Sequence, residues 1–155
     1  MTFQKQYMFN PFVIEQATSQ QIAETYTNLQ NELHEQPSQP FEIAKNIEIY
    51  ANMNYLIGEM IARLAEQCGL KKNEISITEN KQIYMQRKQW EETNTSKAPA
   101  MSYFEAMAKE YVKQDLTELA KMDAQLFRFK KAYESTTEII NALKKKMEAM
   151  KYGLE

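Results

Sequence analysis

Glycine and proline are scarce in this sequence, with three and four copies among 155 residues. Because these two residues form tight turns and interrupt helices, their scarcity excludes a fold of many short elements joined by turns. Residues that favour helices, chiefly Gln, Glu, Lys, Ala and Met, are abundant instead. The composition therefore predicts an all-α fold of few, long helices, and the length is that of one domain.

Cysteine and histidine occur once each, as Cys68 and His34. A lone cysteine cannot form an intramolecular disulfide, and Cys68 lies on an apolar column, so we interpret it as a small buried side chain in a reducing compartment. A structural zinc site needs four Cys or His ligands, and phosphate-binding loops need clustered glycines. We therefore predict no metal, no cofactor, no small-molecule substrate and no enzymatic activity.

Long apolar runs are also missing. No stretch approaches the eighteen apolar residues of a membrane span, and the first sixteen residues lack the apolar core of a signal peptide. We therefore expect a cytoplasmic protein. The net charge is −2, which gives no global attraction to nucleic acid or to anionic membranes. Residues 1–70 hold three basic against eight acidic residues, and residues 71–155 hold sixteen against thirteen.

The N-terminal region divides into a tail and a helix. Residues 1–16 are aromatic-rich and irregular, and they either pack on the helices or dock into a partner. The remaining residues, 17–155, are predicted to form a single helical domain. Its first helix spans about 18–36, with Thr18 or Ser19 as the cap and Gln21 at the position of a capping box.

A second helix is predicted at about 41–68, because apolar residues recur there at the alternating spacing of four and three typical of coiled coils. Asn54 is the polar exception in this column, and we expect its amide to fix the register and number of partners unless it reaches solvent. Gly69 then fits a left-handed C-cap. A third helix is predicted at about 78–93.

The last helix is predicted at about 102–152. Ser102 and Glu105 have the spacing of a capping box, and no glycine or proline follows before Gly153. An antiparallel hairpin of the two long arms, with the N-terminal helix beside it, cannot bury all the apolar columns. We therefore predict an elongated coiled-coil hairpin that forms a homodimeric helical bundle. Its predicted oligomer core comprises Ile43, Ile47, Tyr50, Asn54, Ile57, Ile61, Leu64, Leu119, Leu126, Tyr133, Ile140 and Met147.

Basic and aromatic residues alternate after the second helix. Such a pattern fits either a protein partner or single-stranded nucleic acid, in which cations follow phosphates and rings stack on bases. Four glutamates dilute the segment, so we favour a protein partner and keep nucleic acid as the alternative. The candidate surface comprises Lys71, Lys72, Lys81, Tyr84, Arg87, Lys88, Trp90, Lys97 and Tyr103.

Three stretches resemble small helical early proteins of tailed bacteriophages that infect Gram-positive bacteria: "YANMNYLIGEMIARLAEQ", "QRKQWEE" and "YESTTEIINALKKKMEAMKY". The resemblance covers roughly residues 45–152. It rests on the general residue pattern and on the order of the segments, without a diagnostic motif. It implies a phage or prophage origin and a setting in the host cytoplasm. The implied role is the binding, occlusion or scaffolding of a host or phage protein, or assistance in phage DNA recombination and replication.

Overall fold

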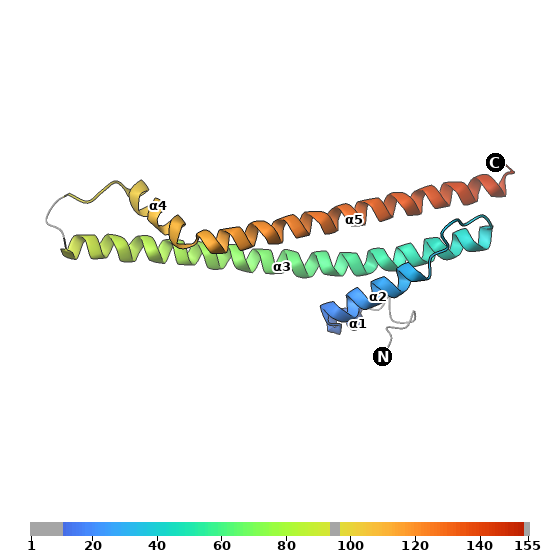
Figure 1. The fold of residues 1–155 in the computed structure, drawn as a ribbon, viewed down its shortest axis with the longest axis horizontal. Coiled ribbons are helices and arrows are strands. Elements are labelled where there is room, and N and C mark those ends of the chain that lie inside the picture. Colours follow the sequence, from blue (N-terminus) through green and yellow to red (C-terminus); the bar gives the residue numbers. More distant parts are fainter. Residues whose placement is uncertain (1–10, 94–96, 154–155) are drawn as a thin grey trace. The chain divides into compact units, whose positions relative to one another are not determined.

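The computed structural model describes residues 11–93 and 97–153, and within those ranges all regular structure is helical (Figure 1). This confirms the predicted all-α class. The helices are α1 (Pro11–Gln16), α2 (Ser19–Asn31), α3 (Pro40–Thr93), α4 (Met101–Tyr111) and α5 (Lys113–Lys151).

The chain divides into two compact units. Unit 1 comprises Met1–Arg63 and Phe127–Glu155, and unit 2 comprises Leu64–Leu126. Both long helices contribute to both units, so α3 and α5 each supply one stretch to unit 1 and another to unit 2. The sequence had predicted a single helical domain at 17–155.

The start of the described chain is more helical than predicted, because Pro11–Gln16 forms α1 within the tail assigned as irregular. Proline suits the first helical position, where its missing N–H has no partner to lose. Phe3, Tyr7 and Phe9 lie outside the described residues. The predicted capping box of α2 is confirmed: the Gln21 N–H donates to Thr18 Oγ1 over 3.1 Å, and the Thr18 N–H donates to Gln21 Oε1 over 2.9 Å.

Helix α2 ends at Asn31 and not at residue 36, because the following backbone is held by a side chain of α3. Asn46 is 2% exposed, and its Oδ1 accepts the His34 N–H while its Nδ2 donates to the His34 carbonyl, both over 2.9 Å. The next helix begins at Pro40, one residue before the predicted start at about residue 41. Glu42 accepts the N–H groups of Ser38 and Gln39 and so satisfies donors at this helix start.

Gly69 is an ordinary helical residue, so the predicted C-cap and the separate helix at 78–93 are wrong. Helix α3 runs unbroken from Pro40 to Thr93, and Gly153, with φ of 68°, is the residue with positive φ in the described part of the chain. A glycine inside a helix costs about 1 kcal/mol. Burial of Cys68 and Ile75 on either side, at 3% and 5% exposure, outweighs that cost in unit 2.

The predicted helix at 102–152 is interrupted at Val112, which separates α4 from α5. The capping box at Ser102 does not form, since the N-cap is Ala100 and no side chain bonds there. Val112 still donates to the Ala108 carbonyl and accepts from the Leu116 N–H, so both of its own backbone groups stay hydrogen-bonded at the bend. The bend keeps Val112 fully buried, and Figure 1 shows the chain changing direction here.

In unit 1, α3 has two apolar faces and each has its own neighbour. One face packs in a cluster with α1 and α2, formed by Ile14, Ala17, Ile22, Leu29, Ile49, Met53 and Leu56. On the other face, Asn54 Nδ2 donates to Thr137 Oγ1 over 2.9 Å. A Cβ added at Gly58 would lie 3.9 Å from the Tyr133 ring, which is ordinary contact, so close packing does not require this glycine. These pairs place α3 and α5 antiparallel within unit 1.

In unit 2, the two long helices are joined by ion pairs. Lys71 Nζ lies 2.7 Å from Asp115 Oδ1 and 3.3 Å from Glu118 Oε2, and Lys72 Nζ lies 3.6 Å from Asp123 Oδ1. Asp115 therefore has a partner on α3. Burial raises the pKa of the Cys68 thiol, and the nearby Asp123 carboxylate adds to that effect.

We predict that Asn54→Leu stabilises the protein. Asn54 is 8% exposed and its Oδ1 has no hydrogen-bond partner, so a buried polar atom is left unsatisfied. Replacing the amide should raise the free energy of unfolding by about 1–2 kcal/mol, because Thr137 Oγ1 retains its bond to the Tyr133 carbonyl. The converse change, Thr137→Val, should lower it by about 1 kcal/mol. Thermal melts test both, and a destabilised Asn54→Leu would contradict the argument.

The contribution of Glu42 to the stability of the fold should depend on pH. The N–H groups of Ser38 and then Gln39 hold the pKa of this carboxyl below its usual 4.5. A lowered pKa in the folded state gives stability that is present above pH 4.5 and lost as the pH falls through the lowered value. Glu42→Gln should therefore lower the melting temperature at pH 7 and have no such effect at pH 2. Glu35→Gln, at an exposed position in the same connection, is the control; an equal loss there would contradict the prediction.

Candidate interaction surfaces

The residues predicted as an oligomer core lie partly inside the single chain. On α3, Ile43, Asn54, Ile57 and Leu64 are buried, and Ile47, Tyr50 and Ile61 are half-buried. On α5, Leu119, Leu126, Ile140 and Met147 are half-buried and Tyr133 is 42% exposed. Asn54 has its polar partner, Thr137, in the same chain. Much of this column is thus used for intrachain packing.

Carboxylates neutralise three of the six basic residues of the predicted binding surface. Lys71 is held by Asp115 and Glu118, and its hydrogen bond to Asp115 raises the pKa of the lysine. Lys72 pairs with Asp123, and Arg87 Nε lies 3.4 Å from Glu91 Oε1. Lys81, Lys88 and Lys97 are exposed, and within the described ranges they form no ion pair. The structure therefore does not assemble the predicted cations into one basic face.

The aromatic members of that surface are also separated. Tyr84 is 67% exposed, whereas Trp90 is half-buried. Tyr103 is 48% exposed and contacts the Phe104 ring edge-on, with centroids 5.5 Å apart. Of the predicted residues, Lys81, Tyr84 and Lys88 share one face of α3, because they are three and four residues apart.

That face of α3 carries an apolar column that sequence reasoning missed. Leu70, Ile77 and Tyr84 follow at intervals of seven and are 64%, 60% and 67% exposed; we call them the α3 stripe. The same heptad column contains Ile49 and Leu56, which are buried in unit 1. The interval of seven was visible in the sequence, but the predicted helix break at Gly69 hid it.

Helix α4 presents a second exposed column in unit 2. Its inner face consists of Phe104 and Ala108 and is continued by Val112, the residue that follows the helix; all three are at most 2% exposed. Its outer face carries Tyr103, Met107 and Tyr111, which follow at intervals of four and are 48%, 41% and 64% exposed; we call them the α4 stripe. Tyr103 belonged to the predicted surface, and the other two residues did not.

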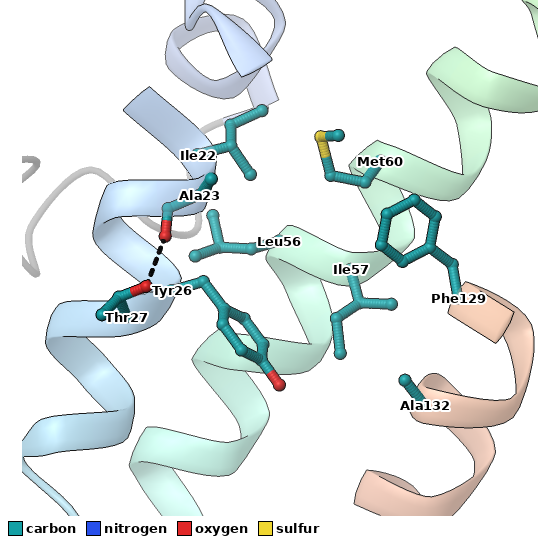
Figure 2. A pocket seen from close by; sticks show the side chains of 9 residues that line it. All are labelled: Ile22, Ala23, Tyr26, Thr27, Leu56, Ile57, Met60, Phe129 and Ala132. Carbon is teal, nitrogen blue, oxygen red and sulfur yellow. Dashed lines mark hydrogen bonds between the residues drawn. The ribbon is translucent and has the colours of Figure 1, made fainter. Parts of the chain in front are cut away.

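Unit 1 contains an apolar groove of about 300 Å³ between α2 and α5, with α3 as its floor (Figure 2). Its lining residues are Ile22, Ala23, Tyr26, Thr27, Leu56, Ile57, Met60, Phe129 and Ala132. Burial raises the pKa of the Tyr26 hydroxyl, and Tyr50 adds to the effect. The Thr27 hydroxyl donates to the Ala23 carbonyl over 3.1 Å, so it is not directed at a ligand. The groove suits an apolar side chain and offers no charged group.

Within residues 11–93 and 97–153, no group of three or more His, Cys, Asp or Glu side chains is arranged to hold a metal ion. Over the same ranges, no helix has both the length and the apolar character that crossing a membrane requires. Comparison with family models, curated proteins and solved structures finds no match to this chain.

We predict that Ala132→Leu fills the groove and stabilises the protein. The added methyl and methylene carbons would lie against Ile57 and Phe129, and their burial should raise the free energy of unfolding by about 1–2 kcal/mol. Ala142→Leu, an exposed position on the same stretch of α5, is the matched control and should change stability little. Denaturant unfolding measures both. A destabilised Ala132→Leu would show that the walls cannot accommodate the larger side chain.

Proposed function

We propose that this chain is a non-enzymatic, homodimeric interaction protein that binds another protein through the α4 stripe. Binding would occlude or scaffold that partner. The resemblance to early phage proteins favours a host or phage protein as the partner.

The observation that carries this proposal is that α4 is apolar on two adjacent faces, which lie about 100° apart around the helix because the residues of one column directly follow those of the other. Its inner face is buried within unit 2, while its outer face leaves two tyrosines and a methionine exposed. A helix that is apolar on two sides is normally covered on two sides. Tyr and Met are also enriched in protein interfaces, because they bury large areas and adapt to irregular surfaces. These properties favour an apolar helix or peptide segment as the bound element.

Nucleic acid is less favoured, because its recognition begins with free cations that neutralise phosphates. Carboxylates already neutralise Lys71, Lys72 and Arg87. The α4 stripe itself carries no cation, and the nearby Lys113 is paired with Glu110 over 3.4 Å.

Met107→Glu tests the proposal. A carboxylate in the centre of the α4 stripe should reduce recovery of the bound protein at least tenfold, because the contact would bury an unpaired charge. Ala106→Glu is the matched control: it adds the same charge at an exposed neighbour outside the stripe. Both variants should keep the wild-type circular dichroism and melting temperature.

The measurement is quantitative mass spectrometry of proteins retained from a Gram-positive bacterial lysate, beside anisotropy of labelled single-stranded DNA. Equal retention of the same proteins by Met107→Glu and Ala106→Glu would rule out the α4 stripe as the contact. Salt-sensitive DNA binding that is lost in Lys81→Glu and Lys88→Glu would replace the proposed function with nucleic-acid binding.

A further inference from the structure

The α3 stripe lies in a pattern of charges that changes sign at its central residue. Along one face of α3 in unit 2, intervals of three and four residues give Glu66, Leu70, Glu74, Ile77, Lys81, Tyr84 and Lys88. On this face, the two charged residues before Ile77 are acidic, and the two charged residues after it are basic. All seven side chains are exposed. In the part of the chain that the structure describes, none of the four charged side chains forms an ion pair.

The pattern is also symmetric in position. Glu66 and Lys88 each lie eleven residues from Ile77, about 16 Å along the helix, and Leu70 and Tyr84 each lie seven residues away. Glu74 and Lys81 are three and four residues from it. Reversal of the helix direction about Ile77 therefore exchanges apolar residues with apolar residues and acidic residues with basic ones.

We propose that a second copy of this chain covers the α3 stripe, with the two α3 helices antiparallel and the two Ile77 side chains at the twofold axis. Leu70 then faces Tyr84 of the second copy, Glu66 faces Lys88 of the second copy, and Glu74 lies near Lys81 of the second copy. This inference rests on the proposed homodimer and names its contact surface.

Charge selects this occupant and its direction. A parallel copy would place Glu66 against Glu66 and Lys88 against Lys88, which is repulsive, whereas the antiparallel copy makes every such contact attractive. A twofold interface uses the same patch on both copies, so a self-complementary patch is what a homodimer requires. Three apolar side chains per copy form a smaller interface than most permanent dimers have. The dimer should accordingly dissociate on dilution through the micromolar range.

Cysteine cross-linking tests the register in a Cys68→Ser background, in which the native buried thiol is removed. Under mild oxidation, Ile77→Cys should give a disulfide-linked dimer, because the two positions meet at the axis. Ser76→Cys, exposed beside the stripe, should not cross-link and is the matched control. Leu70→Cys alone should remain uncross-linked, whereas a mixture of Leu70→Cys and Tyr84→Cys chains should cross-link to each other.

Charge reversal tests the same arrangement without thiols. At low ionic strength, Glu66→Lys and Lys88→Glu should each weaken the dimer at least tenfold in sedimentation velocity, because each creates two like-charge contacts. The double variant Glu66→Lys/Lys88→Glu should restore wild-type association. Met107→Glu, which alters the α4 stripe, should leave the dimer unchanged.

Two results would overturn the inference in distinguishable ways. A dimer that resists both reversals, or in which Leu70→Cys cross-links to itself, would refute the antiparallel register and leave the proposed dimer standing. A chain that sediments as a monomer up to about 100 μM, beyond the affinity expected for so small a patch, would refute the dimer as well. Partner binding through the α4 stripe is measured separately and can stand in either case.

Discussion

The burial requirement of α3 is the constraint on which the rest of the structure depends. This helix is apolar on more than one side, and a single helical neighbour covers only one side of it. In unit 1, α1 and α2 cover the face of Ile49, Met53 and Leu56, while α5 packs on the face of Asn54 and Gly58. The two short N-terminal helices therefore exist as a cover for α3, and the α2 cap and the Asn46 clamp hold that cover in place.

In unit 2, by contrast, the helices carry more apolar surface than the neighbouring helices of the unit cover. Buried Cys68, Ile75 and Val112 form its interior, and the lysines beside it are joined to carboxylates of α5. These ion pairs are partly exposed, so they contribute little stability and chiefly select which residues of the two helices face each other. The α3 and α4 stripes remain without cover in this unit. Exposed apolar columns at regular helical spacing are the feature that links this fold to binding.

Buried amides define local geometry in unit 1. Asn46 makes two hydrogen bonds to the His34 backbone and thereby fixes the connection between α2 and α3. Asn54 makes one hydrogen bond to Thr137 and leaves its Oδ1 without a partner, so its burial costs more free energy than that of Asn46. Both amides lie within a few turns of one helix, yet one closes a loop and the other aligns two helices. The difference arises from what the opposing element offers: a free backbone pair in one case, and a single hydroxyl in the other.

The sequence by itself determined the features that depend on local chemistry. Scarce glycine and proline predicted the all-α class, and the spacing of Thr18 and Gln21 predicted the α2 capping box, because a cap is complete within four residues.

The tertiary structure decided which of the other local patterns form the predicted helix ends. Gly69 stays helical because Cys68 and Ile75 on the same helix are buried, the predicted last helix is interrupted at the buried Val112, and the predicted cap at Ser102 is unused. Likewise, Lys71 and Lys72 were predicted to lie on the binding surface, but the packing of the helices brings Asp115 and Asp123 beside them. These ion pairs join residues more than forty positions apart in the sequence, and a local pattern cannot predict which distant side chain will lie beside a given lysine.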